Sequence, residues 1–285
     1  MNLETDEAAP CRHAGVPAEW MVERVIRLFE QDIARDPDIL RKSGLSEKEY
    51  LSAYPVAVER IRGRISASDQ PKRAFVDQIL NEGITKGFLR SVRKEASELT
   101  KVYRVELAGG GTAGIIRKGC PDGNHTTRWD RPGWADELYL WWLCPQSRVN
   151  EPGTSVWKGI TRIRKKIASE PRNQLDGVIF FDPLCGTPER PCPKTAFGLT
   201  LDGVRCPPPC IYVMPRLSGA QSGRLNWRGE RRVSFTSALL AIFGVPEAEH
   251  PSYLGFIGFD VAGRDVKTIR ITNNYGGGRT TGCTG

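Results

Sequence analysis

The sequence predicts an α/β (α+β) fold in which a mixed central sheet is flanked by helices and preceded by an N-terminal helical layer. Three observations predict it. Apolar residues recur every three or four positions in the first third of the chain, alternate with polar residues from Val102, and run continuously near residues 175–182. The 285 residues, 39% of them hydrophobic and 26% charged, suffice for a packed core.

The N-terminal helical region is expected to occupy residues 1–100. The apolar positions of residues 22–33 fall on one face of a first helix. Ser46 and Glu49 have the spacing of a capping box, which begins a second helix. A third helix is expected over residues 71–92.

The mixed core is expected to occupy residues 101–272. It begins with a hairpin, because residues 102–107 and 112–118 alternate on either side of a turn that contains three consecutive glycines. Residues 134–142 are expected to form a short helix whose tryptophans share a buried face.

A basic amphipathic helix over residues 156–169 leads into the apolar run at 175–182, which is typical of a strand buried on both faces. The later elements are a strand at 210–214, a helix at 234–243 behind a Ser or Thr cap, and a closing hairpin within 253–272. The tail, residues 273–285, is rich in glycine and is expected to be flexible.

Positive charge is concentrated in two segments. Formal net charge is +8 and the sequence pI is about 9.1, with basic clusters at residues 158–166 and 216–232. Two such clusters fit a surface that follows the phosphates of double-stranded DNA. The alternative is a solvated helix face and a mobile loop. The candidate DNA-binding residues are Lys158, Arg162, Lys165, Lys166, Arg224, Arg228, Arg231 and Arg232.

Four cysteines lie close together in a Cys-rich insertion, residues 183–210, where Pro, Gly and charged residues leave little to bury. They are Cys185, Cys192, Cys206 and Cys210. Four thiolates satisfy a tetrahedral structural zinc site, so the insertion is predicted to bind Zn²⁺. The alternative is a set of unpaired buried cysteines beside a proline-rich loop, because the first spacing, six residues, is wide for a zinc ligand pair.

The end of the hairpin is the candidate chemical site. Lys118 closes the second strand and Asp122 follows in a turn, which would bring an ammonium and a carboxylate to the open end of a sheet. Such a pair suits hydrolysis of phosphodiesters with Mg²⁺, in which carboxylates hold the metal and the lysine orients or deprotonates the nucleophile. The alternative is a solvent-exposed strand end followed by an ordinary Asp-Gly-Asn turn.

The order of elements over residues 70–182, with a lysine closing the hairpin, resembles the core of the PD-(D/E)xK nuclease superfamily and its type II restriction endonucleases. The resemblance implies a Mg²⁺-dependent endonuclease acting on double-stranded DNA, and a homodimer whose two active sites match two strands. The family carries an acidic residue two positions before the lysine. This chain has Ile116 there.

Strand geometry selects a replacement carboxylate. If Leu107 faces Thr112 across the turn, Lys118 lies opposite Lys101, and Glu98 is a neighbour. Glu106 would then lie about 17 Å away and on the other face of the hairpin. The candidate catalytic residues are therefore Glu98, Lys118 and Asp122.

The sequence also offers alternative metal ligands and alternative functions. Asp136 and Glu137 are reserve metal ligands, although acidic residues in the first turn of a helix also complement its dipole. The absence of an acidic residue at Ile116 favours a non-catalytic, zinc-containing DNA-binding protein as the alternative. No P-loop is present and no GxGxxG motif leads from a strand into a helix, which argues against an enzyme of small phosphorylated substrates.

The expected location is cytoplasmic. The chain contains no run of about 18 apolar residues, and its acidic start lacks the order of a secretory signal. We therefore expect no membrane partner.

Overall fold

The described part of the chain has eight gaps of four residues or more. The computed structural model describes residues 19–30, 38–54, 57, 69–96, 101–118, 129–143, 152–170, 174–181, 185, 192, 194–217, 222–263, 265–273 and 279–284. No helix in these ranges is both long enough and apolar enough to cross a membrane.

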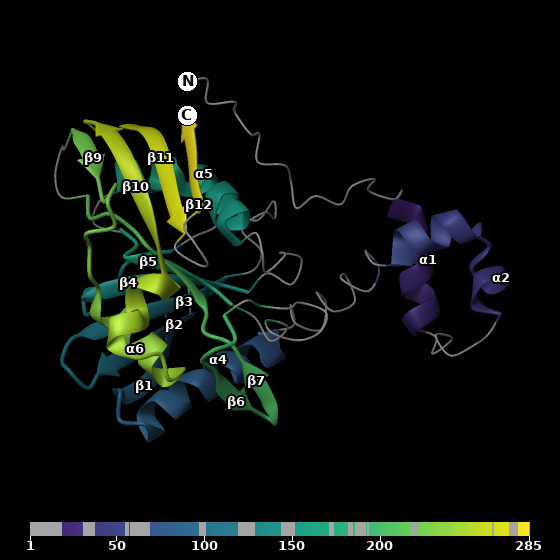
Figure 1. Cartoon of the computed structure of the whole chain (residues 1–285), viewed down its shortest axis with the longest axis horizontal. Helices are drawn as coiled ribbons and strands as arrows, with labels where there is room; N and C mark the ends of the chain where they lie inside the picture. The colour runs from purple at the N-terminus through teal and green to yellow at the C-terminus, as the bar shows by residue number, and fades with distance from the viewer. Residues whose placement is uncertain are drawn as a thin grey trace.

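Helices open the described chain, and runs of strands separated by further helices follow (Figure 1). The helices are α1 (Glu19–Glu30), α2 (Ile39–Ser43), α4 (Asp69–Thr85), α5 (Pro152–Ser169), α6 (Ser234–Ile242) and the 3-10 helix η3 (Glu247–Tyr253). The strands are β1 (Leu89–Ala96), β2 (Lys101–Leu107), β3 (Thr112–Lys118), β4 (Glu137–Trp142), β5 (Gly177–Phe180), β6 (Leu199–Leu201), β7 (Val204–Cys206), β8 (Cys210–Val213), β9 (Gly223–Leu225), β10 (Leu254–Ala262), β11 (Asp265–Asn273) and β12 (Arg279–Thr284).

Ten of these strands form one mixed sheet, in the order β1-β2-β3-β4-β5-β8-β10-β11-β12, with β9 also paired to β10. Strands β1, β2 and β3 are an antiparallel meander, and β3, β4 and β5 are parallel neighbours. Strand β8 runs antiparallel to β5 and parallel to β10. The described strands thus confirm a mixed central sheet with flanking helices.

The sheet separates two hydrophobic cores. Side chains alternate across it, so Val105, Ile115 and Tyr139 pack with α4 and α6 on one face. Ile116 and Leu140 belong to the other core, where α5 packs. We call these the α6 face and the α5 face. Every residue of β5 is buried, as expected for a strand covered on both sides.

The N-terminal helices form a unit with a small core of its own (Figure 1). Residues 47–54 are helical in addition to α1 and α2. The core consists of Val25, Ile26, Leu45, Ala53 and Ala57. The predicted capping box is confirmed, because the Ser46 amide donates to the Glu49 carboxylate at 2.9 Å and the Glu49 amide donates to Ser46 Oγ at 3.4 Å.

The predicted third helix is too long. Helix α4 ends at Thr85, and β1 begins four residues later and pairs antiparallel with β2. Gly87 separates the two elements with a left-handed φ of 76°. The apolar residues beyond Gly87 continue the helical spacing of α4, yet they lie in a strand because pairing with β2 outweighs local preference.

The helix predicted over residues 134–142 is wrong, because Glu137–Trp142 is strand β4. Leu138, Leu140 and Trp142 point to the α5 face, whereas Tyr139 and Trp141 point to the α6 face. Both faces of the strand are buried, so its apolar run is continuous and carries no alternation that distinguishes it from a buried helix.

The tail also departs from expectation. Arg279–Thr284 form β12 and pair antiparallel with β11, so this part of the predicted flexible tail is ordered in the sheet. The hairpin of β2 and β3, helices α5 and α6, and the pair of β10 and β11 are confirmed.

Candidate functional site

The carboxyl ends of β3, β4 and β5 lie at one edge of the sheet, because the three strands are parallel neighbours. Lys118 ends β3 and pairs with Trp142, the last residue of β4. Strand β2 is antiparallel to β3 and therefore begins at the same edge. Ligands of open α/β sheets commonly bind at this edge. We call it the Lys118 edge.

Lys118 is half-buried on the α5 face. Burial, and secondly the positive charge of Lys166, lower the pKa of its ammonium below the usual value. Lys166 comes from α5. Its Nζ donates to the Trp129 carbonyl at 2.9 Å and lies 4.5 Å from the centroid of the Trp129 ring. These contacts hold a second cation close to Lys118.

Trp142 adds a donor to the same place. Its side chain is 1% exposed, and its indole Nε1–H has no hydrogen-bond partner among the described residues. Because paired residues of neighbouring strands share a face, Trp142 lies on the same face as Lys118. Two ammonium groups and an indole N–H are all donors and carry net positive charge. The cluster therefore suits an anion such as a phosphate.

The two predicted carboxylates, Glu98 and Asp122, lie outside the described residues. In sequence, Glu98 is three residues before the start of β2, and Asp122 is four residues after Lys118. Both therefore belong to segments that join strands at the Lys118 edge.

The predicted register of the hairpin is wrong by one residue. Thr112 pairs with Glu106 rather than Leu107, because the Leu107 amide donates to the carbonyl of Gly111 at 3.0 Å and closes the turn earlier. Glu106 consequently shares a face with Lys118 and is not on the opposite one. It still lies level with Thr112, about 20 Å from Lys118 along the strand, so it is too distant to act with the lysine.

Asp136 and Glu137 lie at the opposite edge of the sheet. Asp136 accepts the Thr112 amide at 2.8 Å. Glu137 accepts the amides of Ser234 and Phe235 at 2.7 and 3.0 Å, and so caps α6 in place of the predicted Ser or Thr. A carboxylate at a helix N-terminus complements its dipole. Their helical setting was predicted wrongly, and their distance from Lys118 rules them out as metal ligands beside it.

A buried ion-pair cluster, which was not predicted from the sequence, lies beside them. Asp176 is 1% exposed and accepts the Leu138 amide at 2.7 Å. Its carboxylate is paired with Arg131 at 2.8 Å and with Arg231 on its other oxygen. Arg231 also donates to the Met214 carbonyl at 2.7 Å. We therefore assign Arg231, a candidate DNA-binding residue, to holding the fold together.

Of the remaining candidates in the second basic segment, Arg224, Arg228 and Arg232 are exposed. The guanidinium groups of Arg224 and Arg270 lie 4.9 and 5.2 Å from the centroid of the Trp227 ring. We call Arg224, Trp227 and Arg270 the arginine–tryptophan surface. Arg270 pairs with Gly258 and alternates with buried Ile269, which places it on the α6 face, opposite to Lys118.

The first basic segment lies on the other side of the sheet. Lys166 and Arg164 of α5 are partly exposed, whereas the side chains of Lys158, Arg162 and Lys165 fall outside the described residues. Helix α5 covers the α5 face. The described side chains of the two basic segments therefore lie on opposite faces of the sheet.

The four cysteines do not gather in one cluster, although Cys192 and Cys210 lie close enough to interact electrostatically. None of them is in a disulfide, and all are buried. Cys185 and Cys206 belong to the core of the α6 face, whereas Cys210 belongs to that of the α5 face. No three His, Cys, Asp or Glu side chains in the described ranges are close enough to hold a metal ion.

The surroundings of the thiols also differ from those of zinc ligands. The Lys194 ammonium donates to Cys210 Sγ at 3.1 Å. Burial raises the pKa of the Cys206 thiol to about 11. The described geometry does not confirm the zinc prediction.

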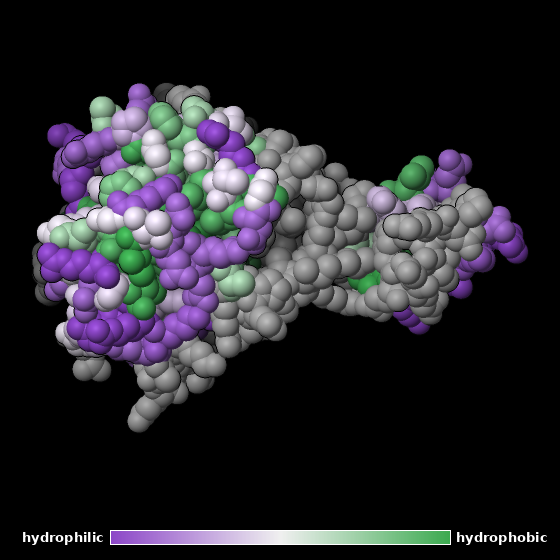
Figure 2. All heavy atoms as spheres, turned by 90° about the horizontal axis from the view of Figure 1, so that it is seen from below, coloured by the Kyte–Doolittle hydropathy of each residue, from purple (hydrophilic) through white to green (hydrophobic). Residues whose placement is uncertain are grey.

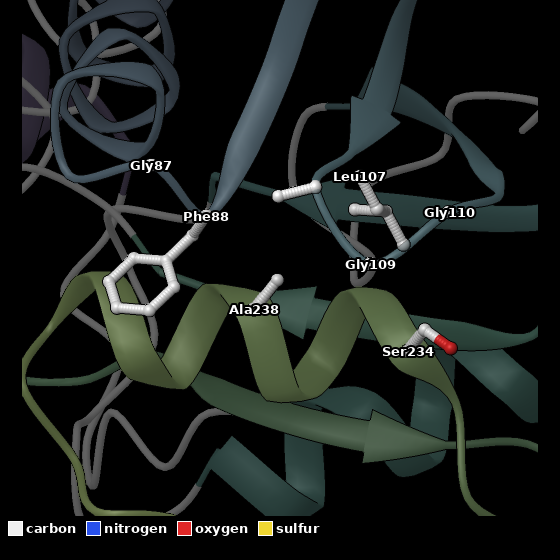
Figure 3. Close-up of a pocket in the computed structure, with 8 residues that line it drawn as sticks. Gly87, Phe88, Leu107, Gly109, Gly110, Ser234 and Ala238 are labelled. Carbon is white, nitrogen blue, oxygen red and sulfur yellow. The ribbon is translucent and has the colours of Figure 1, made fainter.

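A shallow hollow of about 250 Å³ lies between the β2–β3 turn and the start of α6 (Figure 3). It is lined by Gly87, Phe88, Leu107, Ala108, Gly109, Gly110, Ser234 and Ala238. None of these has a titratable side chain, and Glu137 already accepts the Ser234 amide. The hollow therefore lacks the groups that acid–base or metal chemistry needs.

Comparisons with protein-family models, with curated protein sequences and with solved structures find no match to this chain. The case for function consequently depends on the residues and geometry described above.

Proposed function

We propose that this protein is a Mg²⁺-dependent endonuclease that hydrolyses phosphodiester bonds in double-stranded DNA, in the manner of type II restriction enzymes, at the Lys118 edge. One observation carries the proposal: Lys118, with a lowered pKa, ends β3 beside a second lysine and an indole donor. Neighbouring cationic donors attract a phosphate, and a lysine with a lowered pKa is suited to proton transfer.

In this proposal Lys118 orients the attacking water and accepts its proton, which a lysine of lowered pKa does more readily at neutral pH than a surface lysine. Lys166 meets the phosphate oxygens. Glu98 and Asp122 provide the carboxylates that hold Mg²⁺. The metal, when bound, supplies positive charge against the scissile phosphate.

DNA contacts are assigned by face. Helix α5 carries Lys158, Arg162, Lys165 and Lys166 and covers the face on which Lys118 lies, so we assign it to the strand that is cut. The arginine–tryptophan surface faces the other way, so its exposed arginines contact DNA outside the cleavage site. A homodimer, in which two such edges act on two strands, belongs to the same proposal.

A non-catalytic DNA-binding protein is the second candidate. Ile116 favours it, because this residue is fully buried where the resembling nucleases carry an acidic side chain. The exposed arginines around Trp227 would serve binding alone equally well. Structural zinc in the Cys-rich insertion remains a separate prediction. About one zinc per purified chain, lost on Cys206→Ser or Cys210→Ser, would support it, and zinc retained in both variants would count against these ligands.

Plasmid cleavage separates the two candidates. Supercoiled DNA is incubated with the full chain in Mg²⁺ or in EDTA, and the products are resolved on a gel. We expect cutting in Mg²⁺ alone and a loss of about 100-fold or more in the Lys118→Ala variant, the usual loss for a residue in proton transfer. Lys267→Ala, which removes an exposed lysine paired with Asp265, is the matched control and should cut normally. DNA binding without metal-dependent cutting would refute the nuclease proposal.

A further inference from the structure

The N-terminal unit contains a hollow that the proposed nuclease site does not use. Its volume is about 410 Å³, and its described lining consists of Trp20, Arg24, Arg27 and Lys42. The first three are spaced by four and then three residues along α1, so they follow one face of that helix. Lys42 comes from the last turn of α2. Three cations and one aromatic ring therefore border a single depression.

Arg24 is positioned by the turn after α2. Gly44 ends that helix in the left-handed conformation, with φ at 63°. A Cβ atom built at Gly44 would lie 3.0 Å from a guanidinium nitrogen of Arg24. The guanidinium thus lies directly against the Gly44 backbone. Any larger residue at position 44 would place its Cβ atom against this guanidinium. The turn that shapes the unit also fixes one wall of the hollow.

Trp20 is unusually open for its type, with 52% of its surface exposed. Five large hydrophobic side chains are exposed among the described residues, and three of them, Trp20, Leu51 and Tyr54, belong to this small unit. Figure 2 shows hydrophobic and strongly hydrophilic residues side by side on its surface. Of the three, Trp20 alone lines the basic hollow.

We propose that this hollow binds single-stranded nucleic acid, with one base stacked on Trp20 and the adjoining phosphates held by Arg24, Arg27 and Lys42. Proteins that bind single strands combine a basic groove with aromatic side chains on which bases stack. A base inside a duplex has no free face to offer Trp20.

The proposal is independent of Lys118, so the two can fail separately. Binding of a fluorescein-labelled oligothymidine to the full chain is measured by fluorescence anisotropy in EDTA, which prevents metal-dependent cutting. We expect Trp20→Ala to weaken binding about tenfold, within the range for a lost base–aromatic stack. We expect the same variant to cut saturating duplex DNA in Mg²⁺ as fast as the unmodified chain does.

Leu51→Ala is the matched control, because Leu51 is exposed in the same unit, at 62%, and does not line the hollow. It should bind the oligonucleotide normally. An oligonucleotide with abasic sites keeps its phosphates and loses its bases, so it should bind more weakly than the normal oligonucleotide. Its affinity should be the same for the Trp20→Ala variant and the unmodified chain. Lys42→Gln should reduce the salt dependence of binding by about 0.7 in log–log slope, the value for one phosphate contact on a single strand.

Three results would overturn the proposal. Unchanged affinity in Trp20→Ala would place the single strand elsewhere. An equal loss of affinity in Leu51→Ala would show that both substitutions destabilise the N-terminal unit and that Trp20 makes no specific contact with the base. Equal sensitivity of abasic and normal oligonucleotides to Trp20→Ala would exclude stacking.

Discussion

Replacement of Asp176 by Asn should destabilise the protein strongly, although the two side chains have the same shape. The Asp176 carboxylate is buried between the guanidinium groups of Arg131 and Arg231 and also accepts the Leu138 amide. An asparagine keeps one acceptor oxygen and replaces the other with an N–H₂ group. That group would face a guanidinium donor, and both arginines would lose their counter-charge.

The magnitude follows from the burial of the three groups. Breaking a buried ion pair by removing one partner costs about 3–5 kcal/mol. Arg131 retains the carbonyl of Gln174, at 2.9 Å, and Arg231 retains that of Met214, so we expect the lower end of the range, about 3 kcal/mol. For a chain of this size each kcal/mol lowers the melting temperature by about 2–4 °C, and the expected decrease is thus about 6–12 °C.

Thermal unfolding followed by circular dichroism measures this decrease. Asp265→Asn is the control, because Asp265 is exposed and its pair with exposed Lys267, at 2.6 Å, is solvated. Such surface pairs contribute about 0–1 kcal/mol, so its melting temperature should move by at most about 4 °C. If Asp176→Asn melts within that margin of the unmodified chain, the cluster does not hold the sheet edge as argued.

Two further predictions concern the basic groups. Lys166→Gln removes the neighbouring charge that lowers the pKa of Lys118, so that pKa should rise towards its usual value. Because an amine reacts only when deprotonated, Lys118 should then be labelled more slowly by an acylating reagent at pH 8, as read by mass spectrometry; unchanged labelling would contradict the proximity of the two lysines. Arg228→Ala and Arg232→Ala should each reduce the salt dependence of duplex binding by about 0.9 in log–log slope if the exposed guanidinium meets a phosphate. An unaltered slope would remove that arginine from the interface.

The elements that could be predicted from the sequence are those whose pattern is local. The hairpin over residues 102–118 alternates around a glycine turn, and α5 carries its isoleucines at helical spacing. Strand β4 was mistaken for a helix because a strand buried on both faces has no polar alternation. Strands β1 and β12 owe their conformation to partner strands, and such pairing leaves little trace in a short segment.

The site residues could be predicted singly from the sequence, but their proximity in the fold could not. Lys118 was found as the end of a strand, whereas its neighbour Lys166 was assigned to DNA contacts in general. The two meet because α5 crosses over the sheet between β4 and β5, and a one-dimensional pattern does not measure that approach. Asp176 did leave a signal. A single carboxylate at the entrance to an apolar run cannot be buried alone, so it implied a cationic partner elsewhere in the chain.

The position of Ile116 restricts how this sheet can hold a metal. Ile116 is fully buried on the α5 face, between Val102 on β2 and Leu140 on β4. A carboxylate in its place would sit among apolar side chains, where an unpaired charge is expensive. Lys118, two residues further along this face towards the carboxyl end of β3, has access to solvent. Carboxylates that act with Lys118 must therefore come from the segments that join the strands at this edge, as Glu98 and Asp122 do, rather than from β3 itself.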